Sequence, residues 1–218
     1  MSNTTVYLIR HSVRYNIGDI IQDYNTTQDK TLRNEKIILT PEGEKRAEIL
    51  STEPELQNID VAYASNMVRT LQTAKYLLEK QHLKINIDER FDERRAGKPN
   101  DDIYPNWFEL QYKDEKFKTE GGESQLDVRK RVTEAFNEVV SKNRGKRIAI
   151  FAHGYAITFF LLQWCKLIDV NQNQHLTFSF KDEVIFDKKI NAPEVFKLTV
   201  DDKNQPIKIE LIEFDNLK

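Results

Sequence analysis

An arginine and a histidine stand together directly after a short apolar segment near the N-terminus. Residues 5–9 (Thr-Val-Tyr-Leu-Ile) are rich in β-branched and aromatic side chains, which is typical of a buried strand, and Arg10 and His11 follow them. A neutral histidine can act as a nucleophile, a base or a metal ligand, whereas arginine presents a permanent cationic fork that matches phosphate or carboxylate. The pair indicates an anion-binding site, although a salt-bridged arginine and a core histidine can also simply end a strand.

A second apolar segment ends in the same way. Residues 147–152 (Arg-Ile-Ala-Ile-Phe-Ala) are followed by His153 and Gly154. Their nearly unbroken apolar character predicts a strand that is buried on both faces, as in a parallel sheet. In open α/β sheets ligands bind beyond the carboxyl ends of the strands. We therefore expect His11 and His153 to lie at the same edge of one sheet.

Two further segments bring charged side chains toward this edge. Residues 59–64 predict a second strand, and Ser65 can cap a helix whose apolar residues recur at helical spacing and whose first turns carry Arg69. Residues 85–91 predict a third strand that runs into a polar loop containing Glu93. Arg69 and Glu93 are therefore candidate site residues, with a solvated or salt-bridged surface role as the alternative for each.

The remaining patterns predict further helices and a C-terminal group of strands. We expect helices over 41–50 and 107–117, a helix that begins after Ser124 and runs toward Gly145, and an apolar helix after Gly154. The sequence from residue 178 onward predicts strands, with a turn at 203–206 between two of them. Strands that alternate with helices indicate an α/β fold.

Two polar segments contain no readable motif. Residues 18–36 are rich in Asn, Asp, Gln and Thr and are long for a connection inside a compact domain, so a functional lid or a disordered loop is expected there. Residues 98–120 begin with a loop rich in Pro, Asn and Asp and continue into the short predicted helix. We expect these two segments to select the substrate.

Composition limits the classes of partner. The 218 residues predict a single domain over 1–218, and the net charge of -2 favours neither nucleic acid nor an anionic membrane as a partner. No apolar run approaches the roughly 20 residues of a membrane span, so a cytoplasmic protein of unknown oligomeric state is expected. The single cysteine, Cys165, excludes an internal disulfide framework and lies in an apolar run, which predicts a buried, inert thiol.

Five separated motifs resemble those of the histidine phosphatase superfamily, which includes cofactor-dependent phosphoglycerate mutases and many small-molecule phosphatases. In the family's order they are Arg10-His11 with Asn16, Ser65 to Ala74 with Arg69, Phe91 to Gly97 with Glu93, Gly122-Glu123-Ser124, and Ala152-His153-Gly154. They resemble, in turn, the family's Arg-His-Gly, Ser-x-x-x-Arg-x-x-Gln-Thr-Ala, Leu-x-Glu-x-x-x-Gly, Gly-Glu-Ser and second-histidine motifs. The resemblance implies a phosphoglycerate mutase-like, three-layer α/β/α sandwich with a mostly parallel central sheet, a phosphohistidine intermediate and no metal or other cofactor.

The chemistry of phosphoryl transfer gives these residue types definite roles. Arg10 and Arg69 are expected to clamp the phosphate oxygens while His11 attacks in line, because this reaction depends mainly on positioning and charge stabilisation. Asn16 is expected to add a neutral donor, and a protonated His153 a cationic one. These five residues form the predicted phosphate site.

The leaving oxygen needs a proton, and Glu93 is the best candidate for the general acid, with a second role as base toward the attacking water. Two departures from the family pattern mark possible substrate contacts, because Ser12 replaces the usual glycine and Arg14 adds a charge near the predicted pocket. Ser124 is expected to cap a helix and is a further candidate for phosphate contact.

The predicted function is hydrolysis of a small phosphomonoester through phosphohistidine on His11, without a metal. A phosphoglycerate mutase would also have to exclude water while its intermediate turns over, and no mutase-specific residue is evident. A zinc hydrolase could use His11, His153 and a carboxylate, but Arg10 and Arg69 would repel the ion and the usual ligand spacings are missing. A non-catalytic phosphate-recognition module would need the arginines but neither a free His11 nor Glu93.

Overall fold

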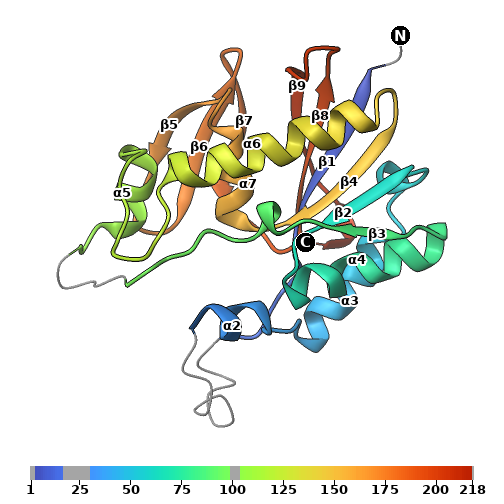
Figure 1. Ribbon diagram of the computed structural model, residues 1–218, viewed down its shortest axis with the longest axis horizontal. Coiled ribbons are helices and arrows are strands. Elements are labelled where there is room, and N and C mark those ends of the chain that lie inside the picture. The colour runs from blue at the N-terminus through green and yellow to red at the C-terminus, as the bar shows by residue number, and fades with distance from the viewer. Residues whose placement is uncertain (1–2, 17–29, 99–103, 218) are drawn as a thin grey trace.

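The computed structural model describes residues 3–16, 30–98 and 104–217, and its centre is a six-stranded sheet (Figure 1). The strands lie in the order β3-β2-β4-β1-β8-β9. Their bounds are β1 (Thr4–Arg10), β2 (Val61–Ala64), β3 (Ile85–Ile87), β4 (Arg147–Ala152), β8 (Glu194–Val200) and β9 (Pro206–Ile212). The first four strands are parallel, while β8 runs antiparallel to β1 and to β9. The predicted mostly parallel sheet is confirmed.

Helices cover both faces of this sheet. Helices α3 (Pro41–Leu50) and α4 (Val68–Gln81) share one hydrophobic cluster with Tyr7 and Ile9 of β1. Helices α6 (Gln125–Lys142) and α7 (Gly154–Leu161) share the other cluster with Val6 and Leu8. Successive side chains of a strand point to opposite faces, so one apolar strand holds both helix layers. The result is the predicted three-layer α/β/α sandwich.

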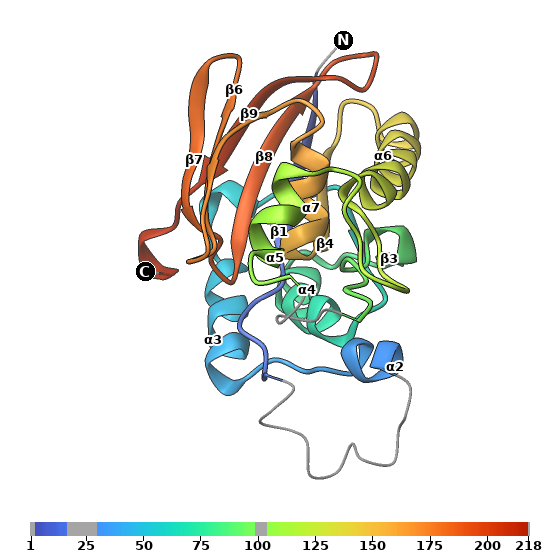
Figure 2. The same ribbon diagram turned by 90° about the vertical axis from the view of Figure 1, so that its left-hand side faces the viewer.

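A second, antiparallel sheet lies beside the C-terminal strands (Figure 2). It has the order β5-β6-β7, with β5 (Lys166–Val170), β6 (His175–Phe180) and β7 (Glu183–Lys189). Three phenylalanines join it to the main sheet, because the rings of Phe178, Phe186 and Phe196 lie 5.1 to 6.1 Å apart. Strand β5 was not predicted, since only its last residue, Val170, is buried and its sequence lacks an alternating pattern.

The helix starts follow the predicted capping signals with one exception. Thr40 caps α3 by accepting a hydrogen bond from Gly43, and Ser124 forms a capping box with Asp127 at the start of α6. Ser65 was expected to cap α4, but the N-cap residue is Met67, which provides no side-chain bond. The Ser65 hydroxyl is used elsewhere, within the candidate active site.

The two predicted substrate-selecting segments are only partly described. Within 18–36, residues 18–29 lie outside the described part, and the remainder contains a helix, α2 (Lys30–Glu35), in place of the expected loop. Within 98–120, residues 99–103 lie outside it, and α5 (Trp107–Lys113) is shorter than the predicted 107–117. The third strand is also shorter, because a 3-10 turn over Glu89–Phe91 replaces its end.

Candidate active site

The two histidines that follow β1 and β4 lie side by side. Arg10 and Ala152 are register partners in this parallel pair, so His11 and His153 emerge at the same edge. The backbone N–H of His11 donates to the Ala152 carbonyl at 3.0 Å, and the two imidazole centroids are 5.2 Å apart. Both side chains are buried. The expected juxtaposition is therefore present.

The protonation of His11 is set by the backbone next to it. Its Nδ1 lies 2.7 Å from the Ser12 carbonyl oxygen, which can only accept, so Nδ1 carries the proton and Nε2 keeps its lone pair. Burial lowers the pKa of His11 well below its ordinary value, and the charges of Arg69 and Arg10 lower it further. His11 is thus a neutral imidazole with a nucleophilic Nε2.

A chain of hydroxyl groups sets the orientation of His153. Its Nε2 lies 2.7 Å from Ser65 Oγ, which is 2.9 Å from Thr70 Oγ1, and that hydroxyl lies 2.6 Å from the Met67 carbonyl oxygen. Since the carbonyl can only accept, Thr70 donates to it, Ser65 donates to Thr70, and His153 Nε2–H donates to Ser65. The Nδ1 atom of His153 is buried and has no partner among the described residues. Nδ1 is therefore the atom that faces a ligand or gains a proton.

The segment after His11 is fixed by helices α3 and α4. The backbone N–H of Ser12 donates to Thr73 Oγ1 at 2.9 Å, and the Val13 carbonyl accepts from the backbone N–H of Thr40 at 3.0 Å. This approach requires glycine at position 43, because a Cβ there would lie 1.9 Å from the Val13 carbonyl oxygen. Gly43 thus permits the close contact that holds the segment after His11.

Two arginines near the histidines form no ion pair among the described residues, although the charges of Glu93 and of other carboxylates act on both. Arg10 donates to the Ile190 and Asn191 carbonyls, both at 2.8 Å, and Arg69 donates to the Asn34 carbonyl at 2.6 Å and to the Met67 sulfur. Burial lowers the pKa of Arg69 to about 10, which still leaves it charged at neutral pH. Neither arginine forms an ion pair with a carboxylate in the described part of the chain. Their charge is available to an anion.

Four buried polar atoms around this point lack hydrogen-bond partners among the described residues. They are Arg10 Nε, Ser12 Oγ, Arg69 Nε and His153 Nδ1. A buried polar atom without a partner costs about 1–3 kcal/mol, so these four atoms, two of them arginine N–H donors, indicate a missing ligand. Three of these groups carry or can gain a positive charge. The site is therefore prepared for a polar anion such as a phosphoryl group.

The Glu93 side chain also lies at this site, on the loop that follows the third strand. Its Oε1 accepts hydrogen bonds from the backbone N–H of Arg94 at 2.9 Å and of Ala156 at 3.2 Å. Ala156 is in the first turn of α7, the helix that begins at Gly154, directly after His153. The half-buried carboxyl group therefore lies at the N-terminus of that helix, within the positive field of the site.

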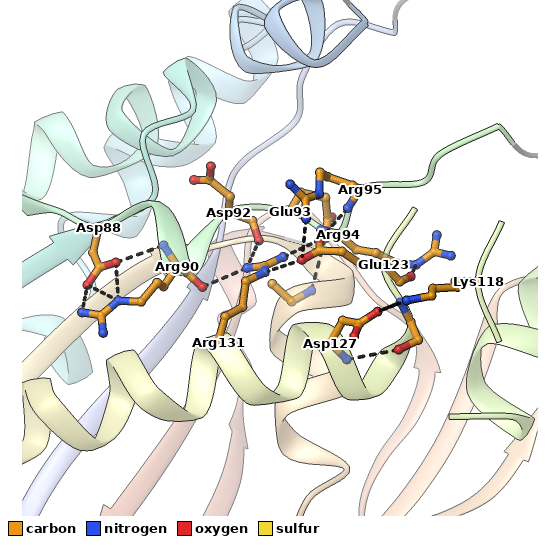
Figure 3. Close-up of polar contacts among 12 residues, drawn as sticks. Asp88, Arg90, Asp92, Glu93, Arg94, Arg95, Lys118, Glu123, Asp127 and Arg131 are labelled. Carbon is orange, nitrogen blue, oxygen red and sulfur yellow. Dashed lines mark hydrogen bonds and ion pairs between the residues drawn. The ribbon is translucent and has the colours of Figure 1, made fainter. Parts of the chain in front are cut away.

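A network of charged side chains holds the Glu93 loop on the side that faces α6 (Figure 3). Arg131 on α6 donates to both carboxylate oxygens of Glu123, at 2.9 and 3.0 Å, and to the carbonyls of Arg90 and Asp92. Burial acts to raise the pKa of Glu123, but the bonds and charges of Arg131 and Arg95 together outweigh it, and the pKa is lowered. Arg131 thereby fixes the loop on the N-terminal side of Glu93.

The Gly-Glu-Ser motif fixes the loop on the C-terminal side of Glu93. Glu123 Oε2 accepts from the backbone N–H of Arg95 at 3.0 Å, and the backbone N–H of Glu123 donates to the Arg95 carbonyl at 2.9 Å. Ser124 accepts from the Asp127 N–H as the cap of α6. Gly97 closes the loop with φ of 69°, where a Cβ would lie 2.5 Å from the Glu120 carbonyl oxygen. This motif therefore positions the Glu93 loop, a role that sequence reasoning missed.

The remaining predicted contacts are less closely defined. Arg14 is partly buried and donates to the Tyr15 carbonyl at 2.8 Å, and burial lowers its pKa while the charge of Glu93 raises it. Its guanidinium thus lies in the same electrostatic neighbourhood as Glu93. Asn16 is exposed at the end of a described range. Its predicted contact with phosphate and that of Ser124 stay predictions.

Neither a metal-binding cluster nor a reactive thiol occurs in the described part of the chain. No group of three or more His, Cys, Asp or Glu side chains there is placed to hold a metal ion. Cys165 is buried in apolar surroundings, and burial raises the pKa of its thiol to about 12, as expected of an inert cysteine. Over the same described ranges, no helix has both the length and the apolar character that crossing a membrane requires.

The fold and the paired histidines define a class of phosphoryl-transfer proteins, and comparison with protein families agrees. Residues 6–180 match the model of the histidine phosphatase superfamily, branch 1. The chain therefore belongs to this superfamily. The matched range contains all five predicted motifs.

Individual relatives are distant in sequence but similar over most of their length. The chain is 26% identical to phosphoserine phosphatase 1 of Hydrogenobacter thermophilus over 153 residues, which cover 64% of this chain and 69% of the relative. It matches the structure of a mycobacterial glucosyl-3-phosphoglycerate phosphatase with a TM-score of 0.68 and 19% identity, covering 98% and 99% of the two chains. It also matches a mutant phosphoserine phosphatase from Entamoeba histolytica in complex with phosphoserine, with a TM-score of 0.61 and 17% identity over 99% and 98%. The structural matches agree with the observed fold.

Proposed function

We propose that the protein hydrolyses a small phosphomonoester through a phosphohistidine intermediate on His11. The observation that carries this proposal is the state of His11, whose Nδ1–H is bound to the Ser12 carbonyl and whose Nε2 is left unprotonated within the field of Arg69 and Arg10. A bound phosphate would give Arg10 Nε and Arg69 Nε their missing acceptor, and would accept from His153 Nδ1 once that atom is protonated. Membership of the histidine phosphatase superfamily supports the same reaction.

In the first step His11 Nε2 attacks phosphorus, and the bond to the ester oxygen breaks. Arg10 and Arg69 stabilise the three equatorial oxygens, which carry the charge of the transition state. A proton on His153 Nδ1 adds a third cationic donor, and binding of the dianion favours that proton. Glu93 transfers its own proton to the departing ester oxygen, so that an alcohol leaves rather than an alkoxide.

In the second step water attacks the phosphohistidine from the side that the alcohol has left. Glu93, now a carboxylate, accepts a proton from this water, the phosphorus–nitrogen bond breaks, and His11 Nε2 recovers its lone pair. Inorganic phosphate leaves and Glu93 is again protonated. The cycle needs no metal, because the arginines supply the charge that an ion would otherwise provide.

The named relatives support hydrolysis over the mutase alternative. Both kinds of relative described above are phosphatases, and no observation on this chain favours transfer of the phosphoryl group to a second substrate. We further propose small phosphorylated metabolites as substrates and the cytoplasm as the location. Support for the location comes from a chain with a single cysteine and hence no disulfide framework.

Rapid quench of a single turnover tests the proposal. Wild-type protein should yield an acid-labile, base-stable phosphoryl adduct on His11, because a phosphoramidate survives alkali better than acid. His11→Ala should lose both adduct and turnover, and His82→Ala, at an exposed histidine, should behave as wild type. Normal turnover by His11→Ala, or activity lost to a chelator and restored by zinc or magnesium, would overturn it.

A further inference from the structure

Arg94 is a buried cation that the phosphate chemistry leaves unused. Its side chain is 4% exposed, and Nε donates to the Glu123 carbonyl at 2.9 Å. In the described part of the chain its two terminal nitrogens have no hydrogen-bond acceptor and the guanidinium forms no ion pair. The charges of Glu93 and Glu123 act on this guanidinium, but neither carboxylate forms an ion pair with it, so its terminal nitrogens can bind an anion that a ligand supplies.

Two aromatic rings hold this guanidinium in place. Arg94 Cζ lies 5.2 Å from the centre of the Trp107 ring and 5.9 Å from that of Tyr155, and these rings lie 6.3 Å from each other. Aromatic faces stabilise a cation and orient its plane without neutralising its charge. The terminal nitrogens are not among the buried atoms that lack partners, so they are open to solvent and to a ligand.

The Arg94 guanidinium and the Glu93 carboxyl group both contact the first turn of α7. Glu93 accepts from the backbone N–H of Ala156, and Arg94 faces the ring of the preceding residue, Tyr155. Burial raises the pKa of Tyr155, and the next charges that act on it are those of Glu93, Arg94 and Arg10. The Tyr155 ring thus lies within reach of the phosphate clamp, the acid and the additional cation.

This arrangement fixes where on a substrate the extra cation can act. If Glu93 protonates the ester oxygen, the first carbons beyond that oxygen lie beside Arg94. A planar guanidinium matches a carboxylate through two parallel hydrogen bonds. We propose that Arg94 binds the carboxylate of a substrate that bears this group on one of the first carbons beyond the ester oxygen, and this inference rests on the proposed phosphatase function.

Matched substrates isolate the contribution of the carboxylate. We expect wild-type protein to hydrolyse 3-phosphoglycerate with a kcat/KM at least about tenfold above that of glycerol 3-phosphate, and O-phosphoserine similarly above O-phosphoethanolamine. Arg94→Gln should lower kcat/KM by about 10- to 100-fold for the carboxylated member of each pair, since that is the value of hydrogen bonds between charged groups. The values for the two compounds without a carboxylate and for p-nitrophenyl phosphate should change by no more than about threefold.

Two further variants separate binding from structure. Arg94→Lys keeps the charge but not the fork, so it should recover part of the preference. Arg95→Gln removes a neighbouring arginine whose side chain is 66% exposed and should keep the full preference. Calorimetry on His11→Ala with 3-phosphoglycerate and glycerol 3-phosphate gives the same comparison without turnover.

The outcomes are distinct. If Arg94→Gln lowers kcat/KM equally for both members of a pair, Arg94 has a structural role. If the wild-type protein does not prefer the carboxylated member, it has no carboxylate subsite. If the protein preferred a bisphosphate to the carboxylated substrates, the ligand of Arg94 would be a second phosphate, and the proposal would be overturned. Failure to hydrolyse p-nitrophenyl phosphate would instead contradict the proposed function, while calorimetry would still decide the role of Arg94.

Discussion

Two neighbouring regions of the protein use buried or partly buried arginines in opposite ways. Behind the Glu93 loop, Arg131 is forked onto the carboxylate of Glu123. At the end of β1, Arg10 and Arg69 are bonded only to carbonyl oxygens and a thioether. A paired charge is balanced within the chain, whereas an unbalanced one costs folding free energy until an anion binds. The first arrangement holds a loop, and the second is prepared for a ligand.

The largest expected effect concerns Glu93, which stands between the two regions. Glu93→Gln should slow single-turnover phosphorylation by an alkyl phosphate about 10²- to 10⁴-fold, the usual value of general acid catalysis. The same step with p-nitrophenyl phosphate should change little, because the phenolate leaves without a proton. Glu120→Gln, at an exposed ion pair, is the control. Equal effects on both substrates would show that Glu93 holds structure or phosphate and is not the acid.

Removal of an unpaired arginine should separate activity from stability. Arg69→Gln is expected to lower kcat/KM about 10²- to 10³-fold, as the loss of one charged donor to a transition state does elsewhere. Its free energy of unfolding should stay the same or rise, because the uncompensated charge no longer has to be buried. Urea denaturation and steady-state kinetics on one preparation measure both. A less stable variant would indicate that Arg69 is paired structurally after all.

Removal of a paired arginine should do the reverse. Among the described residues, Arg131→Gln leaves the buried Glu123 carboxylate with only the backbone N–H and the more exposed guanidinium of Arg95, so we expect a loss of up to about 3 kcal/mol in the free energy of unfolding. Activity should fall about tenfold, mainly for alkyl phosphates, since misplacement of a positioned group by an ångström costs up to about 10²-fold. The double variant with Glu123→Gln should regain part of the stability. Arg90→Gln, at a more exposed ion pair, should cost no more than about 1 kcal/mol.

The smallest effect is a pH dependence of stability. The pKa values of His11 and His153 are lowered chiefly by burial, so the unfolded chain binds protons below about pH 6.5 that the folded chain does not. The free energy of unfolding should therefore fall as pH drops from 7.5 to 5.5, by at most about 1.4 kcal/mol per pH unit for each group. In phosphate-free buffer His153→Gln should show a shallower fall than wild type or His82→Gln. An identical slope in all three would contradict the assignment.

Much of the catalytic layout could be predicted because it follows from strand ends. Apolar runs that stop at His11 and at His153 indicate two buried parallel strands, and parallel strands deliver their last residues to one edge. The starts of α3 and α6 were readable because Thr40 and Ser124 cap through bonds to residues three positions away. Strand ends and helix caps of this kind depend on only a few neighbouring residues.

The supporting contacts could not be predicted because they join distant positions. Ser65 carries a helix-capping signal, but its hydroxyl orients His153, which lies 88 positions away. Arg131 resembles any polar residue of an amphipathic helix, and only the folded chain places it behind the Glu93 loop. Arg94 belongs to an Arg-Arg pair that reads as surface charge, and its burial depends on Trp107. Side-chain partners of this kind have no local sequence signal.

The hydrogen bonds of Arg10 also set when the enzyme can first act. Arg10 is made early, yet its guanidinium is held by the carbonyls of Ile190 and Asn191, the first of them 180 positions later. A ribosome adds about 5–20 residues per second, so roughly ten to forty seconds separate the synthesis of these partners. The phosphate clamp is incomplete throughout that interval. If the proposed reaction requires Arg10, we therefore expect a nascent chain to gain phosphatase activity only after β8 has paired with β1.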